Sequence, residues 1–133
     1  MNYLLSYVIA LVVFGLTDAA WLSIAGTLLY RPLLADILAP SIRIAPALVF
    51  YAIYPIGLTV FAIAPALTAR NGLLALQLGF LFGLLAYATY DLTNYATLRN
   101  WTLQLTVIDI LYGALASSVA AGLSAYISRF VTG

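Results

Sequence analysis

The sequence predicts an all-α fold, a transmembrane four-helix bundle with a short interfacial helix between its first and second helices. About 65% of the 133 residues are hydrophobic and 7% are charged, where a soluble domain carries roughly 25% charged residues. A single core in so short a chain cannot bury that many apolar side chains. Four apolar stretches each have the roughly 20 residues that a helix needs to cross about 30 Å of hydrocarbon. They are uniformly apolar rather than alternating, which argues against barrel strands.

The four predicted spans form a single transmembrane domain over residues 1–133. The first covers about residues 3–28 and is interrupted only by Asp18. The other three cover about residues 46–69, 72–95 and 102–127. The N-terminal segment lacks the basic residues of a cleaved secretory signal, and its apolar run continues too far for one.

The longest predicted connection covers residues 30–45. Its apolar residues recur at helical spacing and are Leu33, Leu34, Ile37 and Leu38. This spacing predicts a short interfacial helix between Pro32 and Pro40. An irregular loop is the alternative.

Four spans place both ends of the chain on one side of the membrane, which we call side A. The first and third connections then lie on the opposite side, side B. Arg70 and Arg129 belong to side A, and side B has Arg31, Arg43 and Arg99. Two arginines against three do not orient the protein by the positive-inside rule.

The charged residues are five arginines and four aspartates, and the chain contains no His, Cys, Lys or Glu. Disulfides, zinc–thiolate sites, haem–histidine ligation and Cys or His nucleophiles are therefore excluded. A net charge of +1 provides no basic patch for nucleic acid. We expect no cofactor and no nucleic-acid partner.

Three aspartates lie inside predicted spans, where an acidic residue costs on the order of 3 kcal/mol and usually faces the interior of a bundle. Asp18 lies past the midpoint of the first span, and Asp91 and Asp109 lie near the side B ends of the third and fourth. At about 1.5 Å of rise per residue, all three fall in the half of the bilayer next to side B.

Tyrosines gather in the same half, namely Tyr30, Tyr51, Tyr54, Tyr87, Tyr90, Tyr95 and Tyr112. An aromatic belt would stay at headgroup level on both sides of the membrane. Tyr87, Tyr90 and Tyr112 instead lie as deep as the aspartates. Because a buried phenol needs a hydrogen-bond partner and a carboxylate accepts well, we expect these two residue types to meet.

Helical phase places the polar residues on one stripe of each helix, at about 100° per residue. Toward side A the stripes are smaller or more apolar, and Gly79 and Gly83 form a GxxxG step that allows close approach of another helix. The sequence thus predicts a bundle closed on side A with a polar cavity open to side B. The candidate ligand- or proton-binding residues are Asp18, Asp91, Asp109, Asn94, Tyr87, Tyr90, Tyr112, Tyr51, Tyr54 and Trp21.

Two alternatives to a ligand cavity remain open. Buried aspartates and tyrosines would also fix helix register by bonding only to one another, at about 0.6–2 kcal/mol for each polar residue. Alternatively, Asp18, Asp91, Asp109 and Asn94 would offer an all-oxygen site suited to Mg²⁺, Ca²⁺ or Na⁺, although we expect no metal.

Three further residues in or near the spans have a predicted structural role. Pro55 and Pro65 free backbone carbonyls in the second span and permit a kink. These carbonyls would form a gate or line the cavity, unless the prolines are merely tolerated in a membrane helix. Trp101 is expected to pack or to mark the headgroup level on side B.

Three segments carry a resemblance to a known family. The most specific is Thr-Tyr-Asp-Leu-Thr-Asn-Tyr-Ala-Thr-Leu over residues 89–98, followed by Trp101. The others are Asp-Ala-Ala-Trp over residues 18–21 and Leu-Thr-Val-Ile-Asp over residues 105–109. With them, nearly the whole chain resembles the bacterial family catalogued as domain of unknown function 2177. The resemblance implies a small bacterial inner-membrane protein and no particular activity, and the matching motif positions are Asp18, Asp91, Asn94, Trp101 and Asp109.

Three classes of function remain. The first is a protein that binds or transports a proton, a cation or a small amphipathic ligand through its buried aspartates. The second is a noncatalytic accessory or structural subunit of a larger membrane complex. The third, a lipid-modifying enzyme using paired carboxylates, is less favoured because the sequence has no motif for a nucleophile. The expected partners are membrane lipid, a small amphipathic or cationic ligand, and a second copy or a larger complex.

Overall fold

A computed structural model describes residues 2–132, which form helices joined by short connections, with no strand in that range. Within this range four helices are long and apolar enough to cross a membrane: Tyr3–Leu34, Ile44–Ala69, Gly72–Thr97 and Leu103–Val131. This confirms the predicted all-α fold with four membrane-length helices.

The first long helix consists of α1 (Tyr3–Ala25), η1 (Gly26–Tyr30) and α2 (Arg31–Leu34). Asn2 caps its start, because its side chain accepts a hydrogen bond from the Leu5 N–H at 3.0 Å. In η1 the helix widens to a π-turn, in which the Arg31 N–H donates to the carbonyl of Gly26. Helical structure between Pro32 and Pro40 is thus the last turn of this helix, shorter than the separate element predicted.

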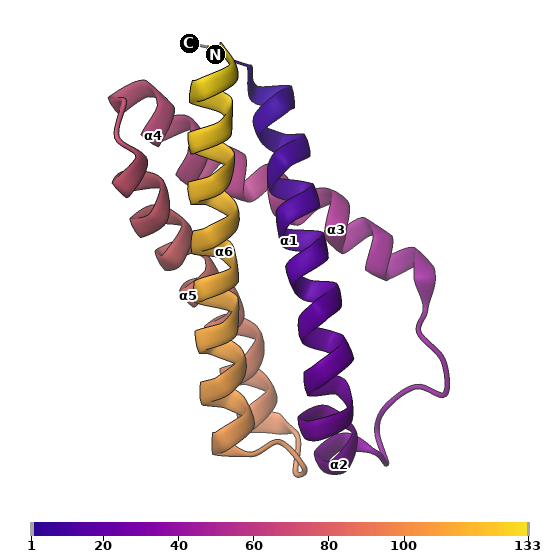
Figure 1. The fold of residues 1–133 in the computed structure, drawn as a ribbon. Helices are drawn as coiled ribbons and strands as arrows, with labels where there is room; N and C mark the ends of the chain where they lie inside the picture. Colours follow the sequence, from indigo (N-terminus) through magenta and orange to yellow (C-terminus); the bar gives the residue numbers. More distant parts are fainter. Residues whose placement is uncertain (1, 133) are drawn as a thin grey trace.

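Residues 35–43, which we call the strap, connect the first long helix to the second. They begin with turns at Ala35–Ile37 and continue as irregular backbone. The side chains of the strap are exposed throughout. Figure 1 shows the strap leaving α2 and running outside the bundle to the start of α3.

The second long helix consists of α3 (Ile44–Leu58), η2 (Thr59–Ile63) and α4 (Ala64–Ala69). Pro55 lies inside α3, one turn before the π-turn η2. The Thr59 hydroxyl donates to the carbonyl of Pro55 at 2.8 Å, which helps to satisfy the backbone where the helix is irregular. Pro65 lies in the first turn of α4, directly after the π-turn η2.

The remaining helices are α5 (Gly72–Thr97) and α6 (Leu103–Thr132). A tight turn joins α4 to α5: Arg70 adopts a left-handed conformation with φ 51° and ends α4, and Asn71 caps α5. At the other end of α5, the Thr102 hydroxyl accepts from the Leu105 N–H at 3.1 Å and so caps the start of α6.

Small residues bring α5 and α6 into close contact, as the GxxxG step predicted. A Cβ atom added to Gly79 would lie 2.8 Å from the carbonyl oxygen of Ser117, and one added to Gly83 would lie 2.4 Å from that of Gly113. Neither position therefore has room for a larger side chain unless the backbones separate.

On side A, α1 and α6 are joined through buried serines. The hydroxyls of Ser6 and Ser128 are 2.8 Å apart, and the Ser124 hydroxyl donates to the carbonyl of Ser6 at 2.7 Å. Alanines, with Phe14, Leu58 and Ile63, fill the rest of the buried core.

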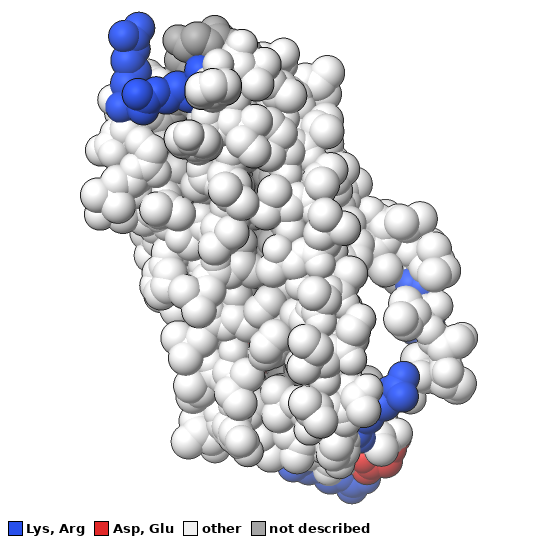
Figure 2. Space-filling view, in the orientation of Figure 1, with Lys and Arg blue, Asp and Glu red and all other residues white. Residues whose placement is uncertain are grey.

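The helices do not pack evenly along their length. In Figure 1, α1 and α6 run side by side, whereas α3 slants away from them toward the strap. The early part of α3 has little buried surface, with Leu48 63% and Val49 57% exposed. Figure 2 shows the charged residues of this face at the two ends of the molecule and on the strap, with uncharged surface between them. This distribution suits a chain whose middle section lies in lipid.

Candidate functional site

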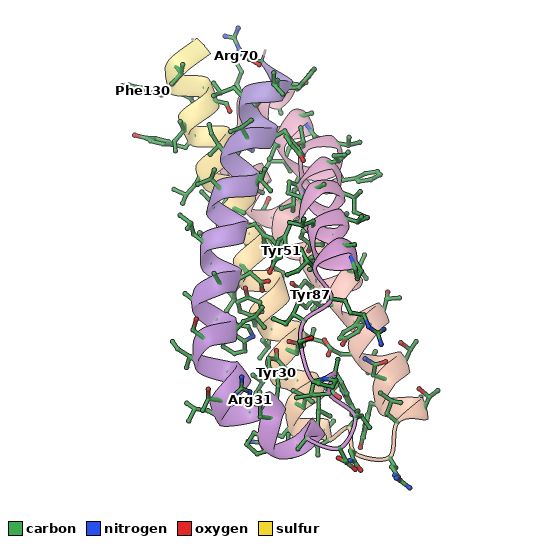
Figure 3. All side chains as sticks on the ribbon, turned by 90° about the vertical axis from the view of Figure 1, so that its right-hand side faces the viewer. Tyr30, Arg31, Tyr51, Arg70, Tyr87 and Phe130 are labelled. Carbon is green, nitrogen blue, oxygen red and sulfur yellow. The ribbon has the colours of Figure 1, made fainter. Side chains whose placement is uncertain are left out.

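A cavity of about 910 Å³ lies in the side B half, where α3 diverges from the other helices. Its walls come from α1, η1, α2, α3, α5 and α6, and the strap contributes Leu38, Ala39, Pro40, Ser41 and Ile42. Figure 2 shows the strap standing off from the helices. In Figure 3 the strap crosses in front of the space into which Tyr30, Tyr51 and Tyr87 extend.

Asp18 is the acidic group of α1 in this cavity, and it is held by two tyrosines. Tyr112 of α6 donates its hydroxyl to Oδ1 at 2.9 Å, and Tyr51 of α3 donates to Oδ2. The Asp18 residue is 7% exposed and lines the cavity. A carboxylate has about four lone-pair directions, so two tyrosine hydroxyls leave capacity for a further donor.

Asp109 of α6 is the second cavity acid, and Tyr30 donates its hydroxyl to it. The same Tyr30 oxygen accepts a hydrogen bond from the indole Nε1 of Trp21 at 2.9 Å. The Trp21 ring stacks on Tyr112, with centroids 4.3 Å apart and an interplanar angle of 8°. One chain of contacts therefore joins Asp18, through Tyr112, Trp21 and Tyr30, to Asp109.

The π-turn η1 makes the Tyr30 contact possible. On a regular α-helix, the 12 residues from Asp18 to Tyr30 would leave the two side chains about 120° apart at about 100° per residue. A π-turn accommodates one extra residue, which brings Tyr30 back to within about 20° of the Asp18 face. The predicted first span ends at about residue 28, so Tyr30 falls in the predicted connection and not among the predicted site residues.

Asp91 of α5 lies behind the cavity wall. It is fully buried at 0% exposure, and neither carboxylate oxygen has a hydrogen-bond partner among the described residues. Its acidic neighbour is Asp109, whose carboxyl group lies beside it. Asp91 does not line the cavity itself, so Asp109 connects it to the open space.

Aromatic rings form much of the remaining wall, including Tyr54, Tyr87, Tyr90 and Trp101. Tyr54 is fixed by a 2.7 Å hydrogen bond between its hydroxyl and that of Ser117. Tyr87 has room because position 113 is glycine: a Cβ there would lie 2.1 Å from the Tyr87 ring. Tyr90 is 57% exposed at the edge and meets Trp101 edge to face at 5.7 Å.

Seven of the ten predicted site residues line the cavity, namely Asp18, Asp109, Tyr87, Tyr90, Tyr112, Tyr54 and Trp21. Three do not. Tyr51 reaches the site through its bond to Asp18, and Asp91 lies beside Asp109. Asn94, one turn after Tyr90, is half-buried outside the lining.

Among the lining residues that the predicted set did not include are Tyr30, Arg31 and Trp101. Trp101 is only 6% exposed and packs with Leu34 and Leu105, so it is a packing residue rather than a headgroup marker. Its place in the family motif was the available signal. Arg31 follows Tyr30 directly, and the same π-turn determines where it lies.

The three aspartates of this half have no cationic partner among the described residues. No ion pair joins an arginine to Asp18, Asp91 or Asp109 within residues 2–132. In that range no three acidic side chains form a group that could hold a metal ion.

The fold and the buried polar site define a polytopic integral membrane protein with an intramembrane cavity. The chain belongs to the family described as "Predicted membrane protein (DUF2177)", whose model matches residues 3–126. This confirms the resemblance found in the sequence motifs. No curated protein and no solved structure matches the chain.

Proposed function

We propose that the protein binds a small amphipathic organic cation within the membrane, in the cavity between α1, α3, α5 and α6. The observation that carries this proposal is that two carboxylates, Asp18 and Asp109, face an open aromatic cavity without a cationic partner among the described residues. A positively charged ligand would supply the missing charge.

The size and lining of the cavity support a small organic ligand. Its volume of about 910 Å³ falls in the range of roughly 300–1,000 Å³ typical of such sites. The stacked pair of Trp21 and Tyr112 lies between the two acids, and aromatic faces attract organic cations by about 0.5–2 kcal/mol.

The mouth of the cavity favours a ligand with an apolar part. Leu22 on α1 is 45% exposed, and Leu38 and Ile42 on the strap are 44% and 77% exposed. All three also line the cavity. A ligand whose apolar groups contact these side chains while its charge reaches Asp18 or Asp109 would use both parts of the site. Location in the cytoplasmic membrane of a bacterium is part of this proposal and rests on the family resemblance.

The proposal is tested by equilibrium dialysis of tetraphenylphosphonium, a permanently charged organic cation, against the purified protein in a neutral detergent. We expect saturable binding of one cation per chain, above the partitioning measured with empty micelles. Asp18→Asn and Asp109→Asn should each weaken binding at least tenfold.

Two controls make this experiment specific. Asp36→Asn removes an exposed acid on the strap, whose carboxylate accepts a hydrogen bond from Asn100 at 2.6 Å, and should leave binding unchanged. The uncharged triphenylphosphine oxide should not compete. Equal binding of the neutral compound, or no loss on replacing either cavity acid, would refute the proposed cation site.

A further inference from the structure

We propose that Asp91 and Asp109 form a one-proton site behind the cavity, and that a cation bound at Asp109 displaces this proton. The inference rests on the proposed cation-binding function and adds a coupled proton to it. Binding would then be an exchange, in which one cation enters the cavity and up to one proton leaves the carboxyl pair for water through the cavity.

The first observation is the environment of Asp91. This side chain has no exposed surface, and neither of its oxygens has a hydrogen-bond partner within residues 2–132. A buried, ionised carboxylate without donors is one of the most costly groups to place in a protein interior. A proton on the carboxyl pair would remove one charge and would also supply a donor.

The second observation is the neighbour. Asp109 lies beside Asp91, and two carboxyl groups in contact away from water do not readily both carry charge. A proton shared between them would form one hydrogen bond that joins the two carboxyl groups. The same arrangement would leave the cavity face of Asp109 available to accept from Tyr30.

The groups around the pair provide no fixed positive charge next to Asp91. Among the described residues, Arg31 is the only arginine that lines the cavity, and it forms no ion pair with Asp91 or Asp109. The titratable and charged groups facing the pair or sharing its cavity are Asp18, Tyr30, Arg31, Tyr54, Tyr87, Tyr90 and Tyr112.

The third observation is that Asp109 belongs to both sites. It lines the cavity, whereas Asp91 does not. A cation in the cavity would stabilise ionised Asp109 and so allow the pair to lose its proton. Since coupling between two ligands is reciprocal, protons would in turn compete with the cation, and binding should strengthen as pH rises.

The test measures proton release when tetraphenylphosphonium binds to the full chain in weakly buffered detergent solution. This cation carries no proton of its own, and the chain contains no His, Cys, Lys or Glu. We expect up to one proton released per cation bound, with Kd falling up to tenfold for each pH unit gained across the transition.

Asp91→Asn is the decisive variant, because the amide can donate to Asp109 without holding a titrating proton. This variant should still bind the cation and release almost no proton. Its Kd should no longer change with pH across the range in which the original pair loses its proton. Asp36→Asn should behave like the original protein. Undiminished proton release from Asp91→Asn would overturn the proposed pair.

Infrared spectroscopy supplies a measurement that requires no variant. Without ligand, the protein should show the C=O stretch of a protonated carboxyl group at neutral pH, and cation binding should remove it. Absence of this band from the ligand-free protein would overturn the proton site even if the cation binds. Conversely, a protein that shows the band but binds no cation would refute the proposed function and the exchange, and leave the carboxyl pair as a protonated structural element.

Discussion

The helices are packed against one another by different residue types in the two halves of the bundle. On side A, serines, alanines and glycines bring α1, α5 and α6 together, and the Ser6 and Ser128 hydroxyls are 2.8 Å apart. On side B, large aromatic residues meet carboxylates around a cavity of about 910 Å³. Both halves contain buried polar groups, so polarity alone does not distinguish them.

The two halves differ in whether the buried polar groups form all their hydrogen bonds within the protein. Each buried serine of the α1–α6 contact bonds within the protein. Asp91 instead has neither oxygen bonded within the described chain, and Asp18 and Asp109 face open space. Buried polar groups in native proteins are nearly always hydrogen-bonded. Asp91 is an exception to this rule, and its buried carboxyl group without a hydrogen-bond partner in the described chain is therefore the strongest indication of function.

The largest loss of stability should come from placing a larger side chain between α5 and α6. Gly83→Ala would place a Cβ 2.4 Å from the Gly113 carbonyl oxygen, and overpacking of this kind costs about 1–3 kcal/mol. We expect a clear loss of thermal stability in detergent. Gly15→Ala is the matched control, because a Cβ there meets nothing within 4 Å. Equal melting temperatures for the two variants would show that the α5–α6 contact is looser than described.

A smaller effect is expected within the aromatic network of the side B half. Tyr30→Phe removes the donor to Asp109 and the acceptor for Trp21, and intramembrane hydrogen bonds contribute about 0.6–2 kcal/mol. Thermal unfolding should show a modest loss of stability. Tyr95→Phe, at an exposed position near the side B end of α5, should have no effect. A similar change in both variants would argue against a specific role for the Tyr30 hydroxyl.

The serine contact on side A should contribute less still. In a double-mutant cycle of Ser6→Ala and Ser128→Ala, we expect a coupling energy near 0.6 kcal/mol, the average for such bonds in membrane proteins. The cycle is measured by unfolding in a denaturing detergent. A coupling energy above about 2 kcal/mol would mean that side A depends on polar contacts as much as on close packing.

Arg99 should contribute almost nothing to folding. It is exposed beyond the end of α5, where an arginine reaches the headgroups. Arg99→Gln should leave the melting temperature unchanged, within the roughly 0.5 kcal/mol typical of surface substitutions. If this variant is not recovered as folded protein, folding depends on the charge of Arg99 more than its exposed position indicates.

Much of this architecture follows from the sequence because it depends on simple quantities. Apolar length gives four membrane-length helices, and span order places Asp18, Asp91 and Asp109 in the same half. The small size of Gly79 and Gly83 indicates a close helix contact, which the structure contains. These inferences require no knowledge of how the helices are rotated against one another.

The features that depend on how the helices are rotated do not follow from the sequence pattern. The π-turn η1 changes the phase of the first helix and brings Tyr30 to Asp109, and no composition signal marks that turn. In α5, Tyr87 lines the cavity and Asp91 faces Asp109 behind it, although four residues of helix separate their directions by only about 40°. The direction of α3 and the path of the strap are set by tertiary packing, so local sequence patterns do not predict them.

Side A of the bundle is packed closed, whereas side B holds an accessible cavity. The chain has no cysteine, so single Ala→Cys substitutions can probe both halves with a charged, water-soluble thiol reagent. Ala86 lines the cavity, whereas Ala120 is fully buried on side A. We predict that Ala86→Cys is modified, more slowly with tetraphenylphosphonium present, and that Ala120→Cys reacts only after unfolding. Rapid modification of Ala120→Cys in the folded protein, or none of Ala86→Cys, would contradict the account.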